Sequence, residues 1–418
     1  MKFDTIIMGG GLSGLTCGIA LAQRGKRVAI VAGGQNTLHF YSGSMELLGN
    51  DGNNDVENPI EAIAQLSDLH PYKIIGADTV ATLAGKAKKL LADAGIKTTG
   101  EATHNHYRIT PMGVTKPAWL TLDGLATATQ PGTLPWSKVC LINLEGFIDY
   151  PIDFAANGLS KLGAKVEIAD ITLDSLRRAR RSATEMRPTN LAKIFTSSSS
   201  LAQLAQAINA IDTDADVVLM PAVVGIDNDD AWDMLKAQVQ RELLMLATLP
   251  PAVTGVRINA ALRHYFQMLG GRFIMGDTVT TAATQGDAVT EVRTAKLQEM
   301  PLQADDYVIA TGSFMSRGLV ANFERVYEPI LDLDTNAPAD HSQWSQYGMM
   351  GDQPYMSYGV ITDANLHPLK GGKPLTNVFA IGQLLAGHNP VVMGDGTGVS
   401  MITALAVASQ ITDNELKN

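Results

Sequence analysis

The first 32 residues constrain the fold more than any other stretch of this chain. An apolar run meets the glycine-rich loop 9–14, helix-compatible sequence follows, and a second apolar run begins at Val28. This order predicts strand, loop, helix and strand. Glycines at Gly9, Gly11 and Gly14 are expected to allow a tight turn, backbone approach to a phosphate, and close packing of helix on strand. The loop and the positive end of the helix dipole favour an anionic phosphate or pyrophosphate. A plain tight turn is the alternative.

Bulk composition describes an ordinary globular protein. Of the 418 residues, 45% are apolar and 18% are charged, which predicts two or three domains with sizeable cores. The 42 acidic and 32 basic residues give a net charge of −10. Such a balance argues against a nucleic-acid binder held by its general charge, while a local basic pocket for an anionic substrate stays compatible with it.

Potential metal ligands are sparse. Cys17 and Cys140 form no C-x-x-C pair, so we expect no zinc or iron–sulfur site, and so few cysteines fit a reducing cytoplasm. His104 and His106 can share one face of a strand, but no third ligand is near in sequence. The sequence shows no secretory signal and no apolar run of membrane-spanning length, so any membrane association is expected to be peripheral or through a partner.

The segment after the second predicted strand departs from the usual dinucleotide pattern. Ala32 stands where an acidic residue usually binds the adenosine ribose, and Gly33 and Gly34 follow it. The next stretch is small and polar enough to lie against a cofactor through Ser42, Gly43 and Ser44. The alternative is a surface loop that leads into a helix around 45–48.

A second α/β passage begins near Lys138. Alternating apolar and helical patterns predict strands at 139–144, 164–171 and 216–221, a helix at 151–162, and a loop or helix entry at 195–200. Four arginines form a cluster that is either a solvated helix end or a docking patch for an acidic partner or lipid headgroups: Arg177, Arg178, Arg180 and Arg181.

The C-terminal third returns to the pattern of the opening. A buried strand ends at Ala310-Thr311-Gly312, another ends at Gly382-Gln383, and the loop Gly394-Asp395-Gly396-Thr397-Gly398 precedes an apolar helix. A second glycine-rich helix start can direct another positive dipole end at a ligand, and in a flavin it would favour negative charge at the N1/O2 edge. Together the three glycine-rich segments predict a flavin site. The cofactor-binding residues expected from them are Gly9, Gly11, Ser13, Gly14, Gly312, Gly382, Gln383, Gly394, Gly396, Thr397 and Gly398.

These segments resemble a known family. The start, the ATG strand and the NVFAIGQ and GDGTG segments are similar to the flavoprotein superfamily that includes glutathione-reductase-like and succinate-dehydrogenase-like enzymes. LHFYSGSMELL, LMPAVVGI, LPPAVTGVRI and ATGSF resemble, more narrowly, the B subunits of anaerobic glycerol-3-phosphate dehydrogenases, and the likeness covers essentially the whole chain. The fold expected is α/β: a Rossmann-like flavin-binding domain of glutathione-reductase type from 1–60, 252–320 and 375–418, an inserted α/β middle domain over 61–251, and a small cap over 321–374.

The resemblance implies a membrane-associated complex at the cytoplasmic face of the inner membrane. Its partners would be the flavin-containing catalytic A subunit and the iron–sulfur C subunit, which attaches to the membrane. The complex would oxidise sn-glycerol 3-phosphate to dihydroxyacetone phosphate and pass electrons to quinone. The B subunits of the family are described as binding FMN, which has no adenosine ribose and so agrees with Ala32; FAD held through backbone groups is the alternative. Gln383 replaces the aspartate that usually meets the ribityl chain.

Two residues are candidates for substrate chemistry. His39 is the base that can be placed near the flavin, and Arg317, just beyond the ATG strand, can meet a phosphate. Ordinary packing or solvent exposure is the alternative for both residues. The scarcity of acid and base candidates also favours a second hypothesis, in which the chain transfers electrons without catalysing substrate oxidation. A third hypothesis is a free-standing FAD-dependent oxidoreductase.

Overall fold

A five-stranded parallel sheet in a computed structural model brings distant parts of the chain together. The structure describes residues 2–179, 186–297, 299–348, 351 and 353–415. The strand order is β13-β2-β1-β16-β21. The strands are β1 (Lys2–Met8), β2 (Val28–Ala32), β13 (Arg272–Met275), β16 (Gln303–Ile309) and β21 (Val378–Ala380). The predicted strand, loop, helix and strand at the N-terminus is confirmed.

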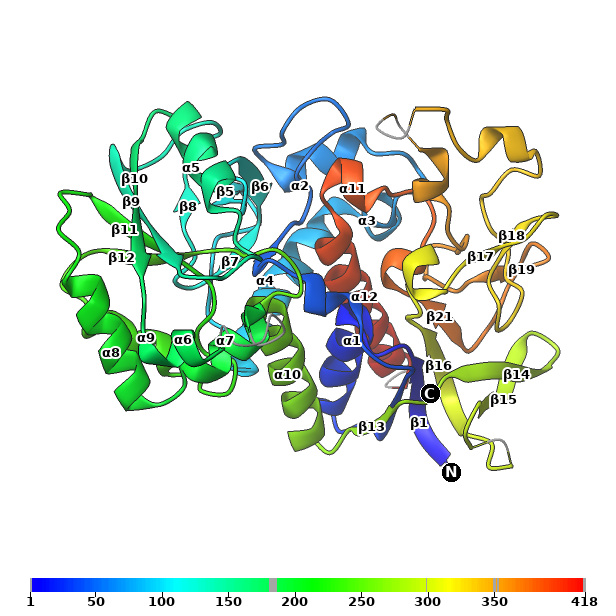
Figure 1. Cartoon of the computed structure of the whole chain (residues 1–418). Coiled ribbons are helices and arrows are strands. Elements are labelled where there is room, and N and C mark those ends of the chain that lie inside the picture. The colour runs from blue at the N-terminus through cyan, green and yellow to red at the C-terminus, as the bar shows by residue number, and fades with distance from the viewer. Residues whose placement is uncertain (1, 180–185, 298, 349–350, 352, 416–418) are drawn as a thin grey trace.

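Apolar helices cover this sheet. Helices α1 (Leu12–Ala22) and α12 (Gly396–Glu415) pack side by side at the centre of the molecule, as the blue and red helices of Figure 1 show. All residues of α1 are buried, so this helix is apolar all round because it lies inside the core. Helices α4 (Ala77–Asp93) and α10 (Val253–Met268) each contact α1 as well.

A second parallel sheet lies on the left of Figure 1. Its order is β10-β9-β11-β12, from β9 (Lys138–Leu144), β10 (Lys165–Ile171), β11 (Val217–Pro221) and β12 (Leu243–Leu246). Its helices are α5 (Ile152–Lys161), α6 (Asp174–Ala179), α7 (Pro188–Ile194), α8 (Ser198–Asn209) and α9 (Ala231–Lys236). The serine run is confirmed as a helix entry, because the Ser197 hydroxyl accepts a hydrogen bond from the Ser200 N–H at 3.2 Å.

Small antiparallel sheets and short helices complete the chain. Two three-stranded sheets contain β3 (Ser44–Met45), β4 (Thr98–Thr99), β5 (His106–Ile109), β6 (Thr115–Ala118), β7 (Leu120–Leu122) and β8 (Thr127–Ala128). Two-stranded pairs are β14 (Val279–Gln285) with β15 (Ala288–Thr294), β17 (Val320–Ala321) with β18 (Val326–Tyr327), and β19 (Leu369–Lys370) with β20 (Lys373–Pro374). Short helices are α2 (Pro59–Ala62), α3 (Pro71–Ile75) and α11 (Pro390–Met393). The helix expected around 45–48 is wrong: Ser44 and Met45 pair with β7, which leaves too short a segment for a helix.

The side chains form two hydrophobic cores. One surrounds the five-stranded sheet and includes residues of α4 such as Val80 and Leu91, and the other runs from Ile109 to Leu246 around the second sheet. The expected domain limits stay a prediction; α4, within the expected middle domain, packs in the first core. Within the described part of the chain, no helix combines the length and apolar character needed to cross a membrane.

Candidate flavin site

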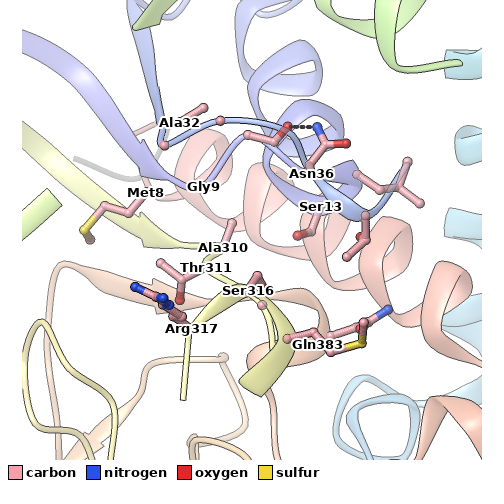
Figure 2. A pocket seen from close by; sticks show the side chains of 18 of the residues that line it. Met8, Gly9, Ser13, Ala32, Asn36, Ala310, Thr311, Ser316, Arg317 and Gln383 are labelled. Carbon is pink, nitrogen blue, oxygen red and sulfur yellow. Dashed lines mark hydrogen bonds between the residues drawn. The ribbon is translucent and has the colours of Figure 1, made fainter. Parts of the chain in front are cut away.

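A cavity of about 580 Å³ opens at the carboxyl ends of β1, β2 and β16. In open parallel sheets this edge is where ligands bind, because the loops there leave the sheet toward different helices. Figure 2 shows the cavity from close by. The described residues that line it are 8–13, 31–38, Tyr41, Thr278, Val279, 310–312, 315–317, Pro329, Ile330, Gln383, Thr397 and Ser400.

The glycines of the first loop serve different purposes. A Cβ atom on Gly9, whose φ is +122°, would lie 2.1 Å from the Ala310 carbonyl oxygen. A Cβ on Gly14 would lie 2.0 Å from the Gly9 carbonyl oxygen, so this glycine lets helix α1 pack against the loop. A Cβ on Gly11 would meet nothing within 4 Å, and Gly11 lines the cavity. Gly11 therefore leaves space in the cavity for a phosphate group.

Helix α1 presents its N-terminus to the cavity. Gly11 caps the helix in an extended conformation without a side-chain hydrogen bond, and the first turn holds no acidic residue. Leu12 and Ser13 line the cavity. Backbone N–H groups at a helix start that no side chain caps, together with the helix dipole, attract an anion.

One end of the cavity lies beside the end of β2. Ala32 is buried, and its carbonyl accepts hydrogen bonds from the Gly276 and Asp277 N–H groups, whereas Gly33 and Gly34 are exposed. The loop that follows is held in place by Asn36, whose side-chain amide donates to the Gly10 carbonyl at 2.7 Å. The described residues that line this end include no carboxylate, as the sequence indicated.

The other end of the cavity is more polar. Thr397, in the first turn of α12, donates to the Glu46 carbonyl at 2.8 Å, and its hydroxyl accepts from the Glu46 N–H at 2.7 Å. Glu46 forms a 2.9 Å ion pair with Arg108. The nearby Tyr41 hydroxyl is buried without a hydrogen-bond partner, and burial, followed by the charge of Glu46, raises the pKa of Tyr41 well above its ordinary value. Sequence reasoning missed this cluster because its members come from three segments of the chain.

Most of the predicted cofactor residues belong to the first loop, the β2 end and the late glycine turns. Those that line the cavity are Gly9, Gly11, Ser13, Gly33, Gly34, Gly312, Gln383 and Thr397, and Arg317, the candidate for phosphate contact, lines it too. Arg317 stands beside Thr311 in Figure 2, whereas Gln383 lies beyond Ser316. Gly14 and Gly382 lie directly behind the lining, since a Cβ on Gly382 would be 2.7 Å from the Ser13 hydroxyl oxygen.

Other predicted residues have structural partners instead. Ser42 accepts a hydrogen bond from Arg108 at 2.8 Å, and Ser44 accepts one from Thr121 at 3.0 Å. His39 lies on the 3-10 helix Thr37–Phe40, and its Nδ1 is 3.2 Å from the Asn36 carbonyl. These three residues and Gly43 are not among the described residues that line the cavity.

The glycines of the C-terminal motif mainly allow close packing. A Cβ on Gly398 would lie 2.1 Å from the Tyr72 hydroxyl oxygen, and one on Gly396 would lie 2.8 Å from Nε2 of Gln383. Gly394 ends α11 in a left-handed conformation. Of the motif, Thr397 alone belongs to the described cavity lining. The Gly398 N–H donates to the Glu46 carbonyl, so this helix start is partly satisfied by protein.

The aspartate of the same motif forms a buried network that sequence reasoning missed. Asp395 lies between His70 Nε2, at 3.0 Å, and His388 Nδ1, at 3.2 Å. His70 accepts the Tyr72 N–H at Nδ1, so it is neutral and donates from Nε2. Burial lowers the pKa of His70, and although burial opposes it, the two histidines hold the pKa of Asp395 well below its usual range. Sequence alone offers little signal, because His70 is 325 residues away.

The remaining candidate groups do not converge on a site. His106 contacts Thr121 at 2.7 Å, whereas the largely exposed His104 lies 3.7 Å from Glu57. Both cysteines are buried and free, and burial raises the pKa of Cys17 to about 12. Within the described residues, no group of three potential metal ligands is present. Of the arginine cluster, Arg177 and Arg178 lie at the end of α6, and Arg180 and Arg181 fall outside the described residues.

The cavity fits a flavin nucleotide. The Thr311 and Tyr41 hydroxyls line it and are buried without partners, as expected of groups that bind a polar ligand. Gly11 leaves the phosphate approach open, and the cavity continues on both sides of the glycine loop. A flavin bound here would be held by backbone N–H groups of 11–13, with hydroxyl and amide groups from Thr311, Gln383 and Thr397.

Comparison with known proteins agrees with this geometry. Residues 4–399 match the family described as FAD binding domain. The chain is 42% identical, over 98% of both chains, to the B subunit of anaerobic glycerol-3-phosphate dehydrogenase from Yersinia enterocolitica. It is 38% identical to the corresponding B subunit of Pectobacterium carotovorum, over 98% of this chain and 99% of the relative. The 3-ketosteroid delta1-dehydrogenase of Sterolibacterium denitrificans is 10% identical over 99% of this chain and 100% of its own, with a TM-score of 0.45. The family match and the two B-subunit relatives show that the chain belongs to the B subunits of anaerobic glycerol-3-phosphate dehydrogenase, within the FAD-binding oxidoreductases.

Proposed function

We propose that this chain is the flavin-carrying B subunit of a complex that oxidises sn-glycerol 3-phosphate to dihydroxyacetone phosphate and passes the electrons to quinone. The observation that carries the proposal is the cavity at the glycine loop in a chain that aligns end to end with the B subunits of this enzyme. When bound, the flavin supplies a hydride acceptor for the carbon that bears the substrate hydroxyl. The chain's own residues bind and orient it.

FAD is the cofactor that we propose, with FMN as the alternative. The family description supports FAD. The cavity also continues past the glycine loop to Ala32, Thr278 and Val279, which leaves room for an adenosine group. The missing ribose carboxylate argued for FMN, but the exposed backbone of Gly33 and Gly34 offers hydrogen-bonding groups in its place.

The partners that we propose are the flavin-containing catalytic A subunit and the iron–sulfur C subunit, which attaches the complex to the cytoplasmic face of the inner membrane. Support comes from the designation of the relatives as B subunits. The electron path to quinone would then need a centre in the C subunit, since the described residues of this chain hold no cluster of metal ligands.

A second candidate function is electron transfer without substrate turnover. It is favoured because His39 lies outside the described cavity lining and Arg317 is an arginine that cannot act as a base. The half-buried pair of Glu46 and Arg108 is near the polar end, but Arg108 neutralises the carboxylate. A free-standing FAD-dependent oxidoreductase is less well supported, because the relatives are named as subunits.

Two measurements test these proposals. Release of the cofactor by denaturation, followed by mass analysis, should identify FAD; FMN would reverse that assignment, and no flavin would refute the site. Glycerol 3-phosphate is then added anaerobically to the purified chain without partners, and the flavin absorbance is followed. Bleaching supports substrate oxidation in this chain. If the spectrum stays unchanged and bleaching occurs only with the co-purified A and C partners, the result supports electron transfer without substrate turnover in this chain.

A further inference from the structure

The cavity carries a single charge. Among its 28 described lining residues, Arg317 is the one charged side chain, and every other member is glycine, apolar or neutral polar. Within the described residues Arg317 has no ion pair, and its side chain is exposed. An unpaired guanidinium in a cavity that lacks carboxylates strongly favours an anionic ligand.

The backbone at Arg317 is strained. Its φ of 62° and ψ of 25° put it in the left-handed region, where a residue with a Cβ is disfavoured. The tight turn after β16 enforces this conformation: the Gly318 N–H donates to the Ser313 carbonyl at 3.0 Å, and a Cβ on Gly318 would lie 1.8 Å from the Gly312 carbonyl oxygen. Glycine would fit at this position without strain, so the arginine side chain is present at a cost in backbone stability.

A second donor lies beside the arginine. Thr311 and Arg317 are neighbours in Figure 2, on the side of the cavity where Met8 and Ala310 lie. The Thr311 hydroxyl is buried and has no hydrogen-bond partner. Gly9 touches the Ala310 carbonyl, so this turn adjoins the phosphate-binding loop. Gln383, which is expected near the ribityl chain, lies beyond Ser316.

We propose that Arg317 and Thr311 form an anion subsite for the phosphate groups of the flavin, and that Arg317 does not serve the substrate phosphate. The inference rests on the proposed flavin function. The guanidinium would donate N–H groups to phosphate oxygens, and the Thr311 hydroxyl would donate a further hydrogen bond. These side-chain donors from the turn after β16 would add to the backbone N–H groups at the start of α1.

Flavin-free protein titrated with FAD, FMN and riboflavin tests the subsite, because riboflavin lacks phosphate. We expect Arg317→Gln to weaken FAD and FMN binding by roughly 10- to 100-fold, while the Kd of riboflavin stays unchanged. Thr311→Val keeps the side-chain shape and should weaken FAD binding about fivefold. FAD affinity should fall with added salt in the wild type and fall less in Arg317→Gln. Equal losses for FAD and riboflavin, or no loss for either, would overturn the inference.

Glycine variants separate binding from folding. Arg317→Gly should raise the Tm of the flavin-free chain and still weaken FAD binding as much as Arg317→Gln does. The matched control is Asp332→Gly, another left-handed position, with φ 57°, that is not among the described lining residues. It should leave FAD binding unchanged, and its Tm should rise less than that of Arg317→Gly because it also removes the exposed ion pair between Asp332 and Arg325. A normal FAD affinity in Arg317→Gly refutes the subsite alone, whereas a wild-type chain that binds none of the three flavins refutes the proposed function as well.

Discussion

The two parallel sheets differ at the carboxyl ends of their strands: the first has a cavity there, and in the second buried side chains fill the corresponding turn. After β1, the loop of glycines leaves a cavity and exposes the start of α1. After β9, the corresponding turn holds Phe147 and Tyr150, both buried and stacked with ring centroids 6.5 Å apart, and Asp149 paired with Arg187 at 2.8 Å. The parallel fold therefore supplies the edge, and the side chains of the first turn decide whether a ligand can use it.

The largest expected loss of unfolding free energy comes from Asp395, the buried carboxylate of the C-terminal glycine motif. Asp395→Asn should cost about 3 kcal/mol of unfolding free energy, because the buried His70 and His388 rings lose their charged hydrogen-bond partner. The His70 ring cannot simply turn over, since its Nδ1 accepts the Tyr72 N–H. Chemical denaturation measures the loss. A change below about 1 kcal/mol would mean that this network does not support the first core.

Acid should weaken the fold through its neutral histidines. Burial lowers the pKa of His106 to about 4 and also lowers that of His70. Each of these histidines takes up a proton more readily in the unfolded chain than in the folded one. Their contribution to the unfolding free energy is therefore fully present above pH 6.5 and is lost as the pH falls from 6.5 toward 4. For His106 the loss is at most about 3 kcal/mol. Unfolding free energies at several pH values should show a shallower slope in His106→Gln; an unchanged slope contradicts the assignment.

A pair of glycine variants distinguishes packing from binding at the open edge. Gly14→Ala should cost about 1–3 kcal/mol of unfolding free energy, because its Cβ would lie 2.0 Å from the Gly9 carbonyl oxygen. The added Cβ of Gly11→Ala would meet no protein atom within 4 Å, so this variant should keep its stability. It should lose flavin affinity instead, because the Cβ would occupy cavity space. Thermal unfolding and flavin titration of both variants measure the two effects. Loss of stability in Gly11→Ala would show that this glycine, too, serves packing.

The smallest effect is expected at the filled edge. Arg187→Gln removes the partner of Asp149, but the arginine side chain is 50% exposed, so water can replace it. We expect a loss of about 1 kcal/mol in unfolding free energy and no change in flavin content. Denaturation and the absorbance of the purified chain measure both quantities. A loss of flavin would show that the two edges are coupled and do not act independently.

Much of the fold could be predicted because its signals are local. The glycine loop between two apolar strands and the alternation after Lys138 predicted the main elements of both parallel sheets, and the structure confirms them. Very short strands such as Ser44–Met45 were missed, since they exist only through pairing with β7. Their residues carry no periodic pattern long enough to detect.

The candidate site was predictable where backbone requirements show in the sequence, and not where side chains meet from distant segments. Gly9 and Gly11 follow from the loop pattern. The environment of Tyr41 is set by Glu46 and Arg108, and Asp395 is hydrogen-bonded to His70. Only the fold brings these residues together. His39 is not among the described lining residues, because proximity along the chain does not fix the direction of a side chain, and its role stays a prediction.

The order of the strands along the chain has a consequence for biosynthesis. The second sheet comes from one continuous stretch, 138–246, whereas β21 and α12 belong to the last 41 residues of the 418-residue chain. During translation the second sheet can therefore form while the first still lacks an edge strand and a central helix. Since Gln383 and Thr397 belong to those later elements, the cofactor cavity is complete only after β21 and the start of α12 have been synthesised. We therefore expect the flavin to bind after these two elements have joined the first sheet.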